Sequence, residues 1–125
     1  MLNNPILFVE DDVISSLAHC AHLRDQGFTV ITAHSAEEAY RLIDRYPRLT
    51  ALVSDFDLGP GDNGLDIARR ARAVNQGLPV VFVSGVAAHV QDQIGRIRGS
   101  MLLAKPVWPE QIVDALWATI GLEAA

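Results

Sequence analysis

The stretch ALVSDFDLGPGDNG, residues 51–64, joins an apolar run to an acidic turn. Its first residues are continuously apolar, which is typical of a strand covered on both faces of a parallel sheet. The run then delivers Asp55 and Asp57 into a turn rich in glycine. A carboxylate at the end of a buried strand is costly unless something binds it. The stretch therefore predicts either a helix cap or a chemically active site at the end of this strand.

Other apolar runs have the length of strands, namely ILFV at 6–9, VVFV at 80–83, MLLA at 101–104 and the alternating run FTVIT at 28–32. The alternation with threonines favours an edge position for the last of these. Apolar residues at helical spacing fill the intervals, over 13–25, 35–46, 64–75, 87–97 and from Pro109 onwards. This alternation predicts an α/β fold, a doubly wound parallel sheet of five strands with five helices in three layers, α/β/α.

Each helix is expected to bury one apolar stripe. The predicted stripes are Val13, Leu17, Cys20 and Leu23 in the first helix, Ile67, Ala71 and Val74 in the third, and Ile112, Leu116 and Ile120 in the last. The neighbours of Cys20 indicate a buried thiol rather than a reactive one. The four histidines show no metal-ligand spacing, and we expect them to be structural or exposed.

Composition narrows the class of protein. A length of 125 residues predicts a single domain over 1–125, and a hydrophobic fraction of 50% supports a packed core. The net charge of −5 argues against a nucleic-acid partner. A lone cysteine excludes an internal disulfide and fits a reducing cytoplasm. No apolar stretch approaches the roughly 20 residues of a membrane-spanning helix, so no membrane insertion is expected.

Polar residues collect where the predicted strands end, as Glu10, Asp11 and Asp12 after the first, Asp55 and Asp57 at the third, Ser84 at the fourth, and Lys105 and Pro106 at the fifth. In an open parallel sheet these ends share one edge, and ligands bind there. Clustered carboxylates repel one another unless a proton or a cation neutralises them, and oxygen ligands favour Mg2+ over Zn2+. A lysine and a hydroxyl complete a pocket for a phosphoryl group, beside an aspartate able to form an acyl phosphate.

Over its full length the chain resembles response-regulator receiver domains. The matching segments are ILFVEDD at 6–12, LVSDFDLG at 52–59, VVFVSG at 80–85 and LLAKPV at 102–107. The resemblance implies a flavodoxin-like sheet with strand order 2-1-3-4-5. It also implies a signalling phosphoacceptor, not an ordinary enzyme, that serves a two-component system or a phosphorelay and switches protein–protein contacts.

The resemblance implies a role for each matching residue. Asp55 corresponds to the phosphoacceptor, while Ser84 and Lys105 correspond to the residues that bind phosphoryl oxygens. The implied cofactor is Mg2+, held by Asp55, by Asp11 directly, by Glu10 through water and by the backbone carbonyl of Asp57. Pro106 corresponds to a proline that is commonly joined by a cis bond. Asp12 is expected to cap the first helix more readily than to bind metal.

Three departures from the family pattern affect these expectations. The segment from Asp55 to Gly64 is one residue longer than usual, with Pro60 one place late. Leu102 replaces the aromatic residue that swings inward on activation, so we expect it to stay packed in both states. Gly85 stands where alanine is common. The signal is then expected as reordering of residues 85–95.

The implied partners are a sensor histidine kinase or a histidine phosphotransfer protein, with an unknown downstream protein, and the chain is expected to be a monomer or a weak dimer. One alternative is a haloacid dehalogenase-like aspartyl-phosphate phosphatase, because DFD at 55–57 also fits its nucleophile motif. In that family, however, the other acids follow the nucleophile, whereas Glu10 and Asp11 precede Asp55. A degenerate receiver is disfavoured because all site residues are present. The chain fits a stand-alone regulator and equally a receiver fragment of a hybrid histidine kinase.

Overall fold

The predicted apolar runs form one parallel sheet in the computed structural model, which describes residues 4–85, 91, 93, 95 and 97–124. The strands are β1 (Ile6–Val9), β2 (Val30–Ala33), β3 (Ala51–Asp55), β4 (Val80–Ser84) and β5 (Met101–Ala104). Their order is β2-β1-β3-β4-β5, which confirms the order expected from the resemblance and the edge position of β2. All pairs are parallel, so the carboxyl ends of the strands lie along one edge.

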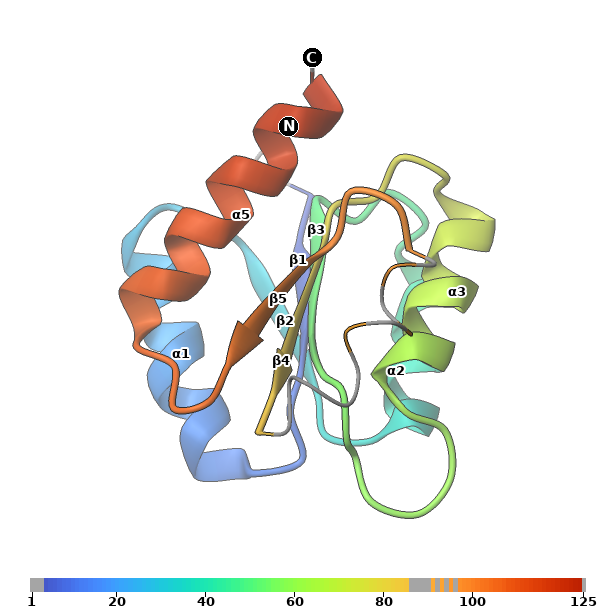
Figure 1. The fold of residues 1–125 in the computed structure, drawn as a ribbon, viewed down its shortest axis with the longest axis horizontal. Helices are drawn as coiled ribbons and strands as arrows, with labels where there is room; N and C mark the ends of the chain where they lie inside the picture. Colours follow the sequence, from blue (N-terminus) through green and yellow to red (C-terminus); the bar gives the residue numbers. More distant parts are fainter. Residues whose placement is uncertain (1–3, 86–90, 92, 94, 96, 125) are drawn as a thin grey trace.

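Helices cover both faces of the sheet, as the alternation of elements predicts (Figure 1). α1 (Val13–Asp25) and α5 (Pro109–Ala124) lie on one face, and α2 (Ala36–Arg45) and α3 (Gly64–Val74) lie on the other. The described residues thus contain four helices. The fifth, expected over 87–97, falls mostly on positions outside the described residues. No described helix has both the length and the apolarity needed to span a membrane.

Two hydrophobic cores form, one on each side of the sheet. The core under α1 and α5 includes Phe8, Leu23 and Leu116, and the core under α2 and α3 includes Leu52, Ile67 and Phe82. Every residue of β1, β3 and β4 is buried, which explains their continuous apolar sequences. Full burial of each large apolar side chain stabilises the fold by roughly 1.5–3 kcal/mol.

The structure corrects part of the predicted helix stripes. Cys20 and Leu23 are buried, whereas Val13 and Leu17 are 50% and 65% exposed. Ser16 instead joins the inner stripe of α1, and its hydroxyl lies 3.8 Å from the Cys20 sulfur. Because α1 is apolar on several sides, periodicity alone does not show which stripe faces the sheet.

The stripes of the other two helices are largely as predicted. Ile67 and Ala71 of α3 are buried, but Val74, its last residue, is 44% exposed and the prediction for it is wrong. In α5, Ile112 and Leu116 are buried, and Ile120 packs on the same core while partly buried. α5 begins at Pro109 as predicted.

Candidate functional site

Three charged residues from separate strands point to the same side of the sheet, toward α1 and α5. Side chains alternate between the two faces along a strand, so each residue shares its face with the residue two positions earlier. Phe8, Val53 and Leu103 all pack in the core beneath α1 and α5. Their i+2 neighbours are Glu10, Asp55 and Lys105, and these three residues line one cavity.

Backbone hydrogen bonds continue the sheet by one residue beyond the strand ends. The N–H of Glu10 donates to Ala33 at 3.0 Å, and the N–H of Lys105 donates to the carbonyl of Ser84 at 2.9 Å. After Asp55, the N–H of Phe56 donates to Val83 at 2.8 Å. The backbone that carries each charged side chain is therefore held by the sheet.

The charged atoms lie close together. The Nζ atom of Lys105 is 3.2 Å from Oδ2 of Asp55 and 4.0 Å from Oε1 of Glu10. One carboxylate oxygen from each of Glu10, Asp11 and Asp55 lies within 4.8 Å of the other two. Glu10 and Asp55 are buried, at 6% and 4% exposure, while Asp11 is exposed.

Burial and like charge set the protonation of this cluster. Burial and, after it, the neighbouring carboxyl group of Glu10 raise the pKa of Asp55 to about 8, against the opposing effect of the Lys105 ammonium. Burial and Glu10 also raise the pKa of Asp11. The pKa of Glu10 is lowered despite its burial, because it accepts hydrogen bonds from Asp55 and from the N–H of Asp12 and faces Lys105. A proton thus resides on Asp55 when no cation neutralises the cluster.

The cluster suits a hard divalent cation. Its ligand atoms are carboxylate oxygens, with no Cys or His among the three residues. Such a set favours Mg2+ over Zn2+, because Zn2+ prefers nitrogen and sulfur ligands. A bound cation would replace the proton on Asp55 and leave its oxygen free to react.

Asp12 has the structural role that the sequence favoured. It is the N-cap of α1, and its carboxylate accepts hydrogen bonds from the N–H of Ile14 at 3.1 Å and from the hydroxyl of Ser15 at 2.8 Å. The N–H of Asp12 itself donates to Oε2 of Glu10 at 3.1 Å. Asp12 therefore caps α1 with its side chain and orients the Glu10 carboxylate with its backbone N–H.

Two residues of the predicted site belong to the opposite face of the sheet. Ser84 is buried at the end of β4, two positions after Phe82 of the α2/α3 core. Leu102 is partly buried and packs against that same core. Most of residues 85–95, the segment expected to reorder on activation, lies outside the described residues. The side chain of Asp57 is exposed, and Lys105 and Pro106 are joined by a cis peptide bond as expected.

The sequence patterns do not single out three residues that support the site, Gly64, Tyr40 and Asp62. Gly64 packs so closely on the strand end that a Cβ there would lie 2.4 Å from the carbonyl oxygen of Asp55. Its N–H donates to Phe56 at 2.7 Å. The hydroxyl of Tyr40 in α2 donates to Asp62 at 2.5 Å and thereby tethers the turn after β3. Among these contacts, only that of Gly64 has a local sequence signal, because the dipeptide Asn63–Gly64 at the start of α3 is typical of a turn.

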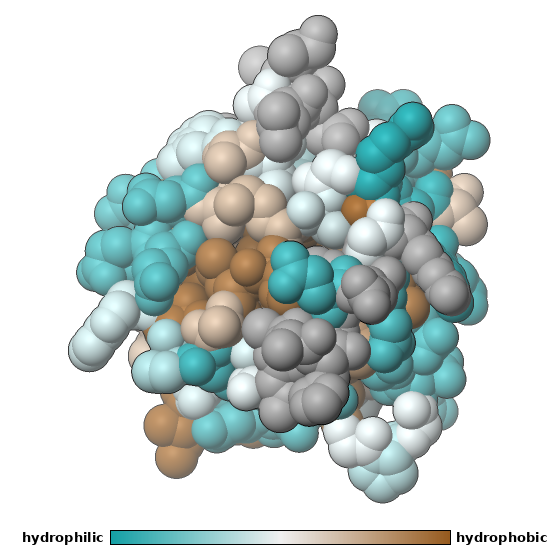
Figure 2. Space-filling view, viewed as in Figure 1, coloured by the Kyte–Doolittle hydropathy of each residue, from teal (hydrophilic) through white to brown (hydrophobic). Residues whose placement is uncertain are grey.

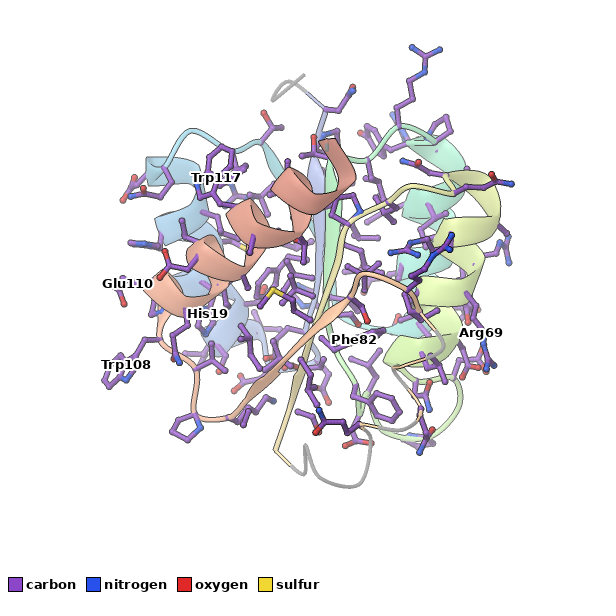
Figure 3. The ribbon with its side chains drawn as sticks, turned by 45° about the horizontal axis from the view of Figure 1, so that its top comes forward. His19, Arg69, Phe82, Trp108, Glu110 and Trp117 are labelled. Atoms are coloured by element: carbon purple, nitrogen blue, oxygen red, sulfur yellow. The ribbon has the colours of Figure 1, made fainter. Side chains whose placement is uncertain are left out.

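A cavity of about 450 Å3 extends from the cluster between α1 and the start of α5. Its walls are mostly apolar, with Phe8, Val83 and Ile112 among them, and His19 lies on the α1 side (Figure 3). The His19 ring stacks on Phe8 with centroids 5.9 Å apart, and burial lowers its pKa. His19 is therefore a neutral, structural residue, as expected. Burial likewise raises the pKa of the Cys20 thiol, consistent with an unreactive cysteine.

Comparisons with known proteins agree with this geometry. A family model described as the response regulator receiver domain matches residues 6–117. Among solved structures, a response regulator receiver protein from Sinorhizobium medicae superimposes with a TM-score of 0.88 at 27% sequence identity, covering 96% of each chain.

Curated relatives extend the comparison. The probable transcriptional regulator ycf29 of Porphyra purpurea is 29% identical over 118 residues, which cover 89% of this chain and 54% of the relative. The sensor protein TorS of Escherichia coli is 28% identical over 117 residues, 90% of this chain and 12% of TorS. The chain thus spans about half the length of the ycf29 regulator and a much smaller part of TorS.

Proposed function

The chain belongs to the response regulator receiver domain family, and from this membership we propose that Asp55 accepts a phosphoryl group from a phosphohistidine. The chain is a receiver domain of two-component signalling, a phosphoacceptor rather than a classical enzyme. The observation that carries the proposal is the contact of buried Asp55 with Lys105 at 3.2 Å, beside the carboxylates of Glu10 and Asp11.

In the proposed reaction, one carboxylate oxygen of Asp55 attacks the phosphorus atom of the donor. An O–P bond forms and the P–N bond of the phosphohistidine breaks, so that an acyl phosphate and a free imidazole result. No electron is gained or lost. Lys105 supplies a positive charge for the phosphoryl oxygens. Ser84 lies one position beyond the residue paired with Asp55, at the end of the adjacent strand β4, and we assign its hydroxyl as a hydrogen-bond donor that reaches the phosphoryl group at the edge of the sheet.

We assign the metal-binding role to the acidic cluster. Asp11 and Asp55 would hold Mg2+ directly, Glu10 through water and Asp57 through its backbone carbonyl. The bound cation supplies positive charge that offsets the negative charge of the phosphoryl group during transfer. Without a cation, the high pKa of Asp55 keeps its carboxyl group protonated near neutral pH and hence a poor nucleophile.

The physiological donor in this proposal is a sensor histidine kinase or a histidine phosphotransfer protein, and the output is a change in protein–protein contacts. We further propose that residues 1–125 form one receiver domain located in the cytoplasm. The buried, protonated thiol of Cys20 is consistent with a reducing compartment.

Mass spectrometry of the intact chain after treatment with acetyl phosphate tests the proposal. With Mg2+, one phosphoryl group should be added; with EDTA, the addition should fall to background. Asp55→Asn should abolish it. Asp57→Asn is the matched control, because it changes an exposed side chain nearby and retains the backbone carbonyl. An unchanged yield in Asp55→Asn would refute the assignment.

A further inference from the structure

The cavity beside Asp55 extends beyond the residues that the phosphoryl reaction uses. Its charged groups lie together, because the Nζ atom of Lys105 is 3.2 Å from Asp55 and 4.0 Å from Glu10. The remaining lining residues are uncharged, and none of them has a role in the proposed phosphorylation. We call the part of the cavity lined by Phe8, Ser15, His19, Val83, Val107 and Ile112 the inner cavity.

The volume of the cavity suits a small organic molecule. The whole cavity encloses about 450 Å3, which lies within the range of roughly 300–1,000 Å3 that is typical of small-molecule sites. An apolar cavity of only about 150 Å3 is enough to hold a benzene ring. The inner cavity therefore has room for one aromatic ring in addition to a phosphoryl group at the charged end.

The apolar walls of the inner cavity are fixed by the core under α1 and α5. Phe8 of β1, Val83 of β4 and Ile112 of α5 belong to this core and are at most 6% exposed. Val107, which follows β5, packs against the same core. Hydrophobic residues also reach the surface between α5 and β5 (Figure 2). Because tight core packing holds side chains from separate elements in place, the inner cavity is built into the fold.

His19 brings an unused hydrogen-bonding group to the inner cavity. Its Nδ1 atom is buried and has no hydrogen-bond partner among the described residues, although buried polar atoms are nearly always paired. In a neutral imidazole one ring nitrogen donates and the other accepts. The ring also stacks on Phe8, with an angle of 26° between the two planes. His19 thus offers a ligand both an aromatic surface and a hydrogen-bonding nitrogen.

Ser15 adds a second polar group on the same side of α1. It precedes His19 by four residues, so the two side chains are neighbours on the helix surface. The Ser15 hydroxyl donates to Asp12 at 2.8 Å, and its oxygen is still able to accept a hydrogen bond. A ligand hydroxyl, which both donates and accepts, suits this pair whichever nitrogen of His19 faces it.

The lining disfavours a charged ligand. A charge among Phe8, Val83 and Ile112 would lose its hydration without gaining an ion pair, and this costs free energy. Lys105 is already paired with Asp55. A ring without a polar group would fit the walls but would leave His19 unpaired.

We propose that the inner cavity binds a small uncharged aromatic alcohol, such as a phenol. Its ring packs against Phe8, Val83 and Ile112, and its hydroxyl forms a hydrogen bond with His19. An aromatic ring suits the stacked pair of Phe8 and His19, because aromatic groups pack favourably in offset or edge-on geometry. This binding site is additional to the proposed function of Asp55 and does not depend on it.

Titration of the isotope-labelled chain with para-cresol in the presence of Mg2+, followed by NMR spectroscopy, tests the site. The amide signals of Phe8, Val83 and Ile112 should shift and then saturate. Para-cresol should bind about fivefold more tightly than toluene, which lacks the hydroxyl group. It should bind at least about tenfold more tightly than benzoate or benzylammonium, each of which carries a charge.

Three substitutions assign the binding to the inner cavity. Val107→Phe should fill it and weaken para-cresol binding at least about tenfold, whereas Val74→Phe, which adds the same side chain on α3, should leave binding unchanged. Val107→Leu adds a single methylene, should weaken binding a few-fold, and serves if Val107→Phe fails to fold. His19→Phe keeps an aromatic ring but removes both nitrogens, so it should abolish the preference for para-cresol over toluene.

Several outcomes would overturn the proposal. Shifts that do not saturate up to the solubility limit of para-cresol would show that there is no site. Binding that Val107→Phe and Val107→Leu leave unchanged would place the ligand elsewhere. Tighter binding of benzoate than of para-cresol would show that Lys105 selects an anion. Failure of acetyl phosphate to label the wild-type chain would count against the function of Asp55 and would leave the aromatic site unaffected.

Discussion

Replacing Asp55 by asparagine should change how the stability of the metal-free protein depends on pH. The folded state raises the pKa of this carboxyl from 3.8 to about 8, so between these values the folded chain retains a proton that the unfolded chain releases. Stability therefore falls as pH rises through this window. Asp55 makes no such contribution to the unfolding free energy below about pH 4, where it is protonated in the folded and the unfolded chain, and it lowers stability by the full amount above about pH 8.

The magnitude follows from the size of the shift. One pKa unit corresponds to about 1.4 kcal/mol, which sets an upper limit near 6 kcal/mol for a shift of this size. Lys105 stays partly exposed and the cavity admits solvent, so we expect roughly 2–3 kcal/mol between pH 5 and pH 8.5. Asp55→Asn cannot ionise and should lack this decrease, so it should be more stable than the wild type at pH 8 by a similar amount.

Urea unfolding in EDTA at a series of pH values measures this effect. Trp117, which packs on Phe28 at a centroid distance of 5.1 Å, provides a fluorescence signal. Other groups with shifted pKa values, Asp11 with its raised pKa among them, are present in both the wild type and the variant. The lowered pKa of Glu10 costs stability only below about pH 4.5, and the lowered pKa of His19 costs stability below about pH 6.5 in wild type and variant alike.

Two controls make the result decisive. Asp57→Asn, which changes an exposed carboxylate close by, should reproduce the wild-type pH profile. Added Mg2+ should restore stability to the wild type at pH 8 and have much less effect on Asp55→Asn. Parallel pH profiles for wild type and Asp55→Asn would refute the reasoning, because they would mean that burial does not raise the pKa of Asp55.

Three further substitutions test how the site is built. Gly64→Ala should lower the unfolding free energy by about 2 kcal/mol or more, since its Cβ would lie 2.4 Å from the Asp55 carbonyl oxygen. Gly121→Ala places its Cβ in open space and should stabilise α5. Thermal unfolding measures both changes. Tyr40→Phe removes the hydrogen bond to Asp62 and should cost about 1 kcal/mol and lower Mg2+ affinity a few-fold in calorimetric titration. Tyr46→Phe, at the C-cap of the same helix, should leave Mg2+ affinity unchanged. Asp11→Ala should weaken Mg2+ binding by about tenfold or more. The melting temperature of the metal-free protein should stay equal or rise, because repulsion from Glu10 is relieved. Undiminished Mg2+ affinity would contradict the role of Asp11 as a ligand.

The site could be located from sequence because strand ends are local features. Each continuous apolar run stops at a polar residue, and parallel pairing brings those stops to one edge of the sheet. The sequence therefore predicts that Asp55, Glu10 and Lys105 lie together, and the distances confirm it. The capping role of Asp12 and the start of α5 at Pro109 follow from equally local rules.

The orientation of α1 could not be read in this way. Its sequence is apolar around most of its circumference, so two stripes compete, and local periodicity favours neither. Packing against β1 and α5 turned Ser16, Cys20 and Leu23 inward and left Val13, Ile14 and Leu17 in solvent.

The strands and their polar ends can be read from the sequence alone, because they depend on neighbours along the chain, and the alternation of strands and helices predicts the parallel pairing that brings those ends to one edge. Three contacts depend on the packing of the folded chain: Lys105 lies nearer to Asp55 than to Glu10, Gly64 lies against the backbone of Asp55, and Tyr40 binds Asp62. Each of these contacts joins segments from different elements. Their distances depend on how the helices and turns pack on the sheet, and no local pattern in the sequence carries that information.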